Sequence, residues 1–184
     1  IPCTPYGCLI MLKQLNSNLS GKNAVVIGGS GFMGSHVADE LSSSGYKVTI
    51  FDLTKPKRND VRFIRGSILN KYLIQSALKN IDFIFHLAAV SDINKVSNIP
   101  IETIETNILG TSNLLEASRK NKIKRFIFAS SIYSHGLKGN LYTTSKISFE
   151  FIIKNYNLLY GIDYTIFRYT TAYGPRNRAV DAIS

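Results

Sequence analysis

Short apolar runs alternate with amphipathic segments along this chain of 184 residues. The runs are rich in Val, Ile and Phe, and they predict β-strands at 23–28, 47–52, 61–65, 82–87, 125–130 and 163–168. The segments with helical spacing predict helices at 32–44, 71–79, 101–120 and 141–160. Continuous apolar strands are typical of a sheet that is covered on both faces. The alternation therefore predicts an α/β fold, a doubly wound parallel sheet whose ligand lies at the carboxyl ends of the strands.

The regular pattern begins at about residue 22, so we predict one domain over 22–184 and an N-terminal extension over 1–21. Cys3 and Cys8 lie in that extension, outside any predicted core. Their number and position match neither a disulfide framework nor a metal site. We therefore expect a reducing, cytoplasmic setting and no metal. No apolar run approaches the roughly 20 residues that span a membrane, so we expect no membrane partner.

The chain is basic, with 22 Lys and Arg against 12 Asp and Glu, a net charge of +10. A basic surface can bind nucleic acid or phosphate groups. Here the basic residues are scattered, and no nucleic-acid-binding motif accompanies them. We therefore interpret the charge as solvated surface and expect no nucleic-acid partner.

Three glycines follow the first strand at intervals of three residues, Gly28, Gly31 and Gly34, and the first helix begins among them. Glycine is required where the backbone takes a positive φ or approaches a ligand closely. Free N–H groups and the helix dipole at such a turn attract an anion. The pattern predicts a cradle for the pyrophosphate of a dinucleotide.

Asp52 ends the second strand, eighteen residues after Gly34. A carboxylate at this place can accept hydrogen bonds from the adenosine ribose hydroxyls and repels a 2′-phosphate, which favours NAD over NADP. Asp is also common in turns at strand ends. Lys55, Lys57 and Arg58 follow closely and could hold a 2′-phosphate, so NADP stays an alternative.

Tyr142 and Lys146 lie four residues apart near the start of a predicted helix, and therefore on one face of it. A tyrosine with a pKa of about 10 is a poor base at neutral pH, and we expect the ammonium of Lys146 to lower it. Ser130 and Ser131 end the strand at 125–130, where this fold places its chemistry. A serine hydroxyl there could pass a proton to Tyr142. Taken singly, a Tyr and a Lys four residues apart can arise by chance, and serines after a strand can simply cap the next turn.

Taken together, these motifs resemble the extended short-chain dehydrogenase/reductase family, in its NAD-dependent nucleotide-sugar epimerase/dehydratase branch. The glycine spacing is the GxxGxxG of that family, and the likeness runs from about residue 22 to 178. The motifs that carry it occur in one order: Gly28–Gly34, Asp52, His86–Ala89, Asn107, Gly110 and Thr111, Ser130 and Ser131, Tyr142, Lys146, Arg168 and Tyr169, and Tyr173–Arg176.

The resemblance implies a role for each matching residue. Ser131, Tyr142 and Lys146 would form the catalytic set, and Tyr142 and Lys146 would also contact the cofactor. The other cofactor-binding residues would be Gly28, Gly31, Phe32, Met33 and Gly34 at the pyrophosphate, Asp52 and Leu53 at the adenosine ribose, Ser67 and Ile68 at the adenine, Leu87, Ala88 and Ala89 beneath the nicotinamide half, and Asn107 nearby.

Three departures from the family pattern concern the substrate side. Ser131 and Tyr142 are closer in sequence than is usual for the family, and Thr171 replaces a common asparagine. The chain also ends at Ser184, where the family's substrate region would begin, so we expect that region to be largely absent.

The resemblance implies an NAD-dependent epimerase/dehydratase that acts on a nucleotide-sugar by transient hydride transfer. Two alternatives stay open: a non-catalytic NAD(P)-binding module, and a reductase or dehydrogenase of a non-sugar hydroxy or keto compound. Many relatives of the family dimerise through two helices per subunit. The segments 101–120 and 149–160 could serve this role in a homodimer, but their apolar faces also fit burial on the sheet.

Overall fold

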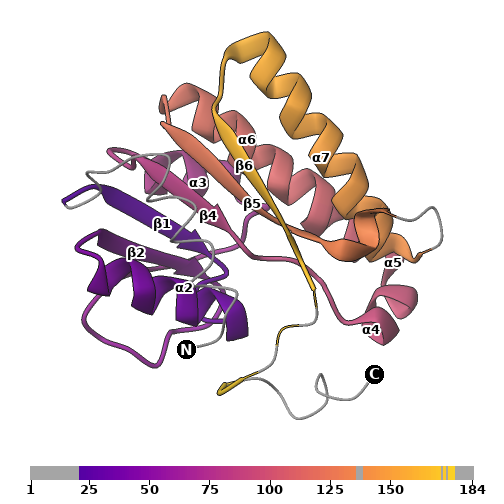
Figure 1. Cartoon of the computed structure of the whole chain (residues 1–184), viewed down its shortest axis with the longest axis horizontal. Coiled ribbons are helices and arrows are strands. Elements are labelled where there is room, and N and C mark those ends of the chain that lie inside the picture. The colour runs from indigo at the N-terminus through magenta and orange to yellow at the C-terminus, as the bar shows by residue number, and fades with distance from the viewer. Residues whose placement is uncertain (1–20, 136–138, 171, 173, 177–184) are drawn as a thin grey trace.

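A single parallel sheet of six strands forms the centre of the computed structural model, which describes residues 21–135, 139–170, 172 and 174–176 (Figure 1). The strand order is β3-β2-β1-β4-β5-β6, and every pairing is parallel. The order reverses between β1 and β4, which is the switch point where ligands bind in such sheets. The strands are β1 (Asn23–Ile27), β2 (Lys47–Asp52), β3 (Arg62–Arg65), β4 (Phe83–His86), β5 (Arg125–Ser131) and β6 (Tyr164–Tyr169).

Helices cover both faces of the sheet, and the strand residues alternate between two apolar clusters. Val25 and Ile27 pack in the cluster beneath α3, α6 and α7, while Ala24 and Val26 pack in the one beneath α2 (Figure 1). Both faces of β1 are therefore buried, which explains its continuous apolar sequence. The helices are α2 (Phe32–Ser43), α3 (Lys71–Ala77), α4 (Ile93–Asn98), α5 (Pro100–Ile104), α6 (Thr111–Lys120) and α7 (Leu141–Tyr160).

The predicted strands and the doubly wound sheet are confirmed, with small differences at the element ends. The helix expected over 101–120 is instead α5, a π-helical turn η1 (Glu105–Gly110) and α6 in succession. Two short elements were not predicted, α4 and the 3-10 turn η2 (Ile132–His135). The extension at 1–20, with Cys3 and Cys8, lies outside the described residues.

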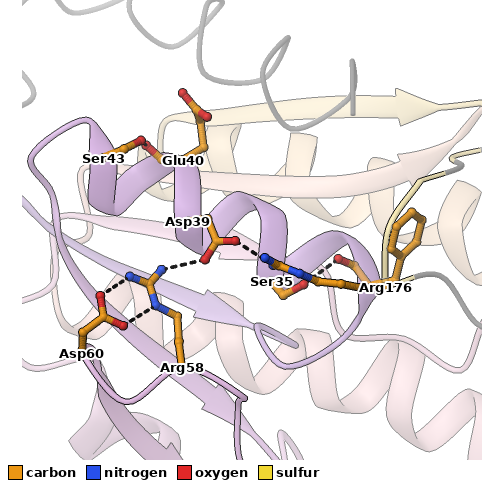
Figure 2. A network of polar contacts seen from close by, with 8 residues as sticks. Ser35, Asp39, Glu40, Ser43, Arg58, Asp60 and Arg176 are labelled. Carbon is orange, nitrogen blue, oxygen red and sulfur yellow. Dashed lines mark hydrogen bonds and ion pairs between the residues drawn. The ribbon is translucent and has the colours of Figure 1, made fainter. Parts of the chain in front are cut away.

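The segment after β6 returns to the outside of α2, far away in sequence. His36 Nε2 lies 2.9 Å from the carbonyl oxygen of Pro175. Arg176 pairs with Asp39 on the same helix, with 2.6 Å between Nη1 and Oδ2 (Figure 2). The helix that follows the glycine turn thus contacts the other end of the described chain.

No helix in the described part of the chain has the length and apolar character needed to cross a membrane.

Candidate functional site

The glycine turn after β1 is built so tightly that side chains would not fit. Gly28 has a φ of +82°, and its N–H donates to the carbonyl of Phe51 on β2. A Cβ added there would lie 2.7 Å from the backbone nitrogen of Ala88. A Cβ on Gly34 would strike the carbonyl oxygen of Gly28. The glycines therefore let α2 and the loop after β4 both approach the turn.

The N-terminus of α2 opens at this turn with exposed backbone donors. Gly31 is its N-cap residue; within the described chain, no side chain caps this helix, and its first turn holds no acidic residue. Phe32 and Met33 begin the helix and are half-buried. The first N–H groups and the positive end of the helix dipole therefore suit a pyrophosphate.

Asp52, at the end of β2, is fixed beside the same turn. Its carboxylate accepts hydrogen bonds from the N–H of Ser30 at 3.0 Å and the N–H of Thr54 at 3.0 Å. Each carboxylate oxygen has a further lone pair, so ribose hydroxyls can still be accepted. Leu53 follows with 63% of its surface exposed, where a ligand could cover it.

The guanidinium of Arg58 pairs with two carboxylates, which makes it less suited to bind a phosphate. It donates to Asp39 at 3.0 Å and to both oxygens of Asp60, while Asp39 also pairs with Arg176 (Figure 2). A guanidinium already paired with two carboxylates attracts a 2′-phosphate less than a free one does. This arrangement favours NAD, in agreement with Asp52.

The residues predicted to contact adenine lie after β3, beside Asp52. The N–H of Gly66 donates to the carbonyl of Asp52 at 3.0 Å, and the Ser67 hydroxyl accepts from the N–H of Leu69. Ile68 is buried in the core. Adenine contacts by Ser67 and Ile68 stay a prediction. Because Ile68 is buried, little of its side chain is accessible to an adenine.

Asn107 holds the loop that follows β4. Its side chain accepts from the N–H of Val90 at 2.8 Å and donates to the carbonyl of Val90 at 3.0 Å. It also donates to the hydroxyl of Ser145 on α7 at 3.2 Å. The π-helical turn that carries Asn107 is a feature often found at functional sites. Asn107 thus joins the end of β4 to the helix of Tyr142.

The loop held in this way contains the three residues predicted to lie beneath the nicotinamide half. Leu87, Ala88 and Ala89 are half-buried at the carboxyl end of the sheet. The N–H groups of Leu87 and Ala88 both donate to the carbonyl of Ile27, the last residue of β1. The loop and the glycine turn therefore form one continuous edge.

Lys146 and Tyr142 lie together on the first two turns of α7. Lys146 is buried, its Nζ donates to the carbonyl of Ala129 at 2.7 Å, and this Nζ lies 5.4 Å from the ring centre of Tyr142. Burial lowers the pKa of Lys146 from 10.5 to about 7. Burial also raises the pKa of Tyr142. The expected lowering of the Tyr142 pKa is therefore wrong for the protein alone, because burial disfavours the charged phenolate.

The two serines at the end of β5 have different partners. The Ser131 hydroxyl accepts from the N–H of Tyr133 at 3.3 Å. The Ser130 hydroxyl donates to Glu150 Oε1 at 2.5 Å. Glu150 also receives two hydrogen bonds from Arg168, at 2.9 and 2.6 Å. Sequence reasoning missed Glu150, although its position four residues after Lys146 places both on one face of α7.

His86 is buried and stays neutral beneath this site. Its Nε2 lies 2.8 Å from the Thr111 hydroxyl, which itself donates to the carbonyl of Asn107, so Nε2 carries the proton. Burial, and next the charge of Lys146, lower the pKa of His86 to about 3. Among the described residues, no group of His, Cys, Asp and Glu could hold a metal ion.

Comparison with known proteins identifies the family. A model of the NAD dependent epimerase/dehydratase family matches residues 24–183. The chain belongs to this family. Membership in the NAD dependent epimerase/dehydratase family confirms the resemblance found in the glycine turn and the downstream motifs.

Two curated members of the epimerase/dehydratase family show the range of enzymes among the relatives. A putative UDP-glucose 4-epimerase of Methanocaldococcus jannaschii is 36% identical over 172 residues, covering 83% of this chain. A UDP-N-acetyl-alpha-D-glucosaminuronate decarboxylase of Bacillus cytotoxicus is 37% identical over 180 residues, covering 84% of this chain. The chain spans 56% of the length of each.

A solved structure from the same family agrees in fold. The UDP-glucose 4-epimerase of Thermus thermophilus, in complex with NAD, is 30% identical to this chain and has a TM-score of 0.77. The match covers 85% of this chain and 57% of that one.

In this family member, the fold brings the predicted site residues to one end of the sheet. The glycine turn, Asp52 and the loop after β4 meet at the switch point, and Lys146 donates to the carbonyl of Ala129, two residues before Ser131 on β5. Thr171 and Tyr173 lie outside the described residues, as do 136–138 of the loop between Ser131 and Tyr142.

Proposed function

We propose that this protein is an NAD-dependent enzyme that acts on a nucleotide-sugar, as an epimerase, a dehydratase or a related enzyme. The observation that carries the proposal is the side-by-side placement of the buried Lys146 and the half-buried Tyr142 on α7, with Lys146 bonded to the strand that ends in Ser131. Family membership and the names of the relatives support the same class of reaction.

The donor set at the switch point fits NAD. The uncapped N-terminus of α2 would hold the pyrophosphate through Gly31, Phe32 and Met33, and Asp52 would accept the adenosine ribose hydroxyls. Gly28 and Gly34 allow the backbone to pack so closely at this turn that no side chain fits, and this brings the N-terminus of α2 and the loop after β4 together where the cofactor would lie. NAD, when bound, would accept a hydride from the substrate and return it, which the side chains cannot do.

Tyr142, Ser131 and Lys146 would move the proton that accompanies the hydride. The hydroxyl of Ser131 would hydrogen-bond to the substrate hydroxyl, and the phenolic oxygen of Tyr142 would take its proton as the C–O bond becomes C=O. Lys146 would stabilise the phenolate by its charge. Return of the hydride to the opposite face of the ring would give an epimer.

The test is a Tyr142→Phe variant made in the complete open reading frame. Turnover of UDP- and dTDP-sugars would be followed by product analysis and by the absorbance of reduced nicotinamide. We expect loss of turnover by at least about 100-fold, as for removal of a general acid–base, with NAD still bound. Tyr72→Phe is the control, because Tyr72 is 78% exposed on α3.

Two results would count against the proposal. Wild-type turnover by Tyr142→Phe would show that Tyr142 is not the acid–base group. Tight NAD binding by the wild-type protein, with no response to any sugar nucleotide, would favour a non-catalytic binding module.

The proposal extends to a homodimer. Large apolar side chains are exposed on α7 at Phe151, Leu158 and Leu159, by 61%, 80% and 71%. Two more are exposed on elements that contact α7: Ile101 on α5, by 67%, and Leu109 in η1, by 53%. Apolar exposure of this kind is typical of a surface that associates. Sedimentation equilibrium of the wild type and of Leu158→Lys measures the oligomeric state of each. A wild type that is monomeric at every concentration would contradict the homodimer.

A further inference from the structure

An ion pair between a buried carboxylate and a more exposed arginine, whose side chain is 34% exposed, lies behind the proposed catalytic residues, on the side of α7 that faces the sheet. The Glu150 side chain is 5% exposed, and Arg168 on β6 donates to both of its oxygens. Burial raises the pKa of Glu150, but the hydrogen bonds from Arg168 and Ser130 outweigh it and hold the pKa below the ordinary value. The carboxylate is therefore charged and held in one orientation.

The sheet register explains how three elements meet at this carboxylate. Ser130 on β5 pairs with Arg168 on β6, so both side chains point to the same face of the sheet. That face is the one covered by α7, where Glu150 reaches both of them. The Ser130 hydroxyl also lies 3.1 Å from that of Ser134 in η2.

Lys146 and Glu150, one helical turn apart, hold two consecutive residues of β5. Lys146 donates to the carbonyl of Ala129, and Glu150 accepts from the hydroxyl of Ser130. The next residue of the strand is Ser131. The distance between Ser131 and the residues of α7 is thus set by two adjacent contacts.

We propose that Glu150 is a positioning residue for the reaction, which acts through Ser130 to hold Ser131 in register with Tyr142. This inference rests on the proposed catalytic set. Arg168 keeps the carboxylate in place and balances its charge, since a buried and unpaired carboxylate would be costly. Displacing a reacting group by about 1 Å can slow a reaction by about 100-fold, so the contact affects rate more than binding.

The test compares three variants in the complete protein: Ser130→Ala, Glu150→Ala and the double variant. We expect Ser130→Ala to lower kcat by about tenfold and Glu150→Ala by about 30-fold or more, with KM and NAD affinity within about threefold. The double variant should be no slower than Glu150→Ala, because both residues act through one contact, the hydrogen bond between the Ser130 hydroxyl and the Glu150 carboxylate.

A conservative variant separates positioning from simple structural support. Glu150→Gln keeps an oxygen that can accept from Ser130, so it should regain most of the kcat lost in Glu150→Ala. Glu116→Gln is the matched control, since Glu116 pairs with Arg119 on α6 with side chains 36% and 39% exposed. Thermal unfolding of each variant reports its folded fraction.

Each outcome has a defined meaning. Wild-type kcat in Ser130→Ala, or additive losses in the double variant, would overturn the positioning role even if Glu150→Ala does not fold. If Tyr142→Phe is inactive while these variants are normal, only the role of Glu150 is wrong. If Tyr142→Phe keeps wild-type turnover, the catalytic set and the positioning role are both wrong.

Discussion

Replacing Lys146 by methionine should stabilise the fold, because the folded protein holds this amine where its charge is poorly solvated. Lys146 is 4% exposed, and its pKa falls from 10.5 to about 7. At about 1.4 kcal/mol for each pKa unit, this fall in pKa means that the charged amine lowers the stability of the folded protein by roughly 5 kcal/mol. Methionine has a similar length without the charge, but it loses the hydrogen bond to Ala129, worth about 2 kcal/mol. The expected net gain in the free energy of unfolding is about 3 kcal/mol at about pH 6.

The sign of the pH dependence follows from the direction of the shift. Between about pH 7 and 10.5, the unfolded chain binds a proton at Lys146 that the folded chain does not. The stability of the wild type therefore rises with pH in this window, while the methionine variant lacks this contribution. The advantage of Lys146→Met should be complete below about pH 7 and close to zero by about pH 9.

Urea unfolding of the nucleotide-free protein at about pH 6 and about pH 9 measures this difference. Lys154→Met is the matched control, because Lys154 is exposed on the same helix and should change stability by no more than about 0.5 kcal/mol. A Lys146→Met variant no more stable than the wild type at about pH 6 would refute the reasoning. An equal difference at both pH values would refute it as well. Stabilisation with loss of turnover would mark a site that favours activity over stability.

Two further predictions concern the glycine turn and Asp52 beside it. Gly34→Ala should lower the free energy of unfolding by about 2–4 kcal/mol, because the added Cβ would strike the Gly28 carbonyl and lie 2.8 Å from the Cα of Gly29. Urea unfolding measures the loss. A loss no larger than that of Gly161→Ala would contradict the prediction. Asp52→Asn should weaken NAD binding and reduce the preference for NAD over NADP, because a charged acceptor becomes a neutral one. Calorimetric titration with NAD and with NADP measures both affinities. An unchanged ratio of the two affinities would contradict the prediction.

The sequence was sufficient for the strands and the glycine turn, because these depend on local features. Strands buried on both faces need runs such as Val25–Ile27, and a turn with positive φ needs glycine at Gly28. Helix α4 was missed because it is short and largely polar. Its visible signal was Asp92, whose carboxylate accepts from the N–H groups of Asn94 and Lys95.

The details of the site depend on contacts between distant segments, which no local pattern reveals. The π-helical turn at Glu105–Gly110 leaves the apolar spacing nearly unchanged, yet it directs Asn107 to the loop at Val90. Glu150 could be placed on the face of Lys146, but its partner Arg168 comes from β6. The raised pKa of Tyr142 comes from burial, whereas the sequence shows only its neighbour Lys146.

The return of the chain from β6 to α2 has a consequence for local unfolding. The contacts of His36 with Pro175 and of Asp39 with Arg176 close a loop of well over a hundred residues. The ion pair is 43% and 41% exposed, and such pairs contribute about 1 kcal/mol or less and weaken in salt. The strap at 174–176 can therefore detach while the sheet stays folded. The backbone amides of Gly174 and Arg176 should exchange hydrogen with water early, and faster as the ionic strength rises.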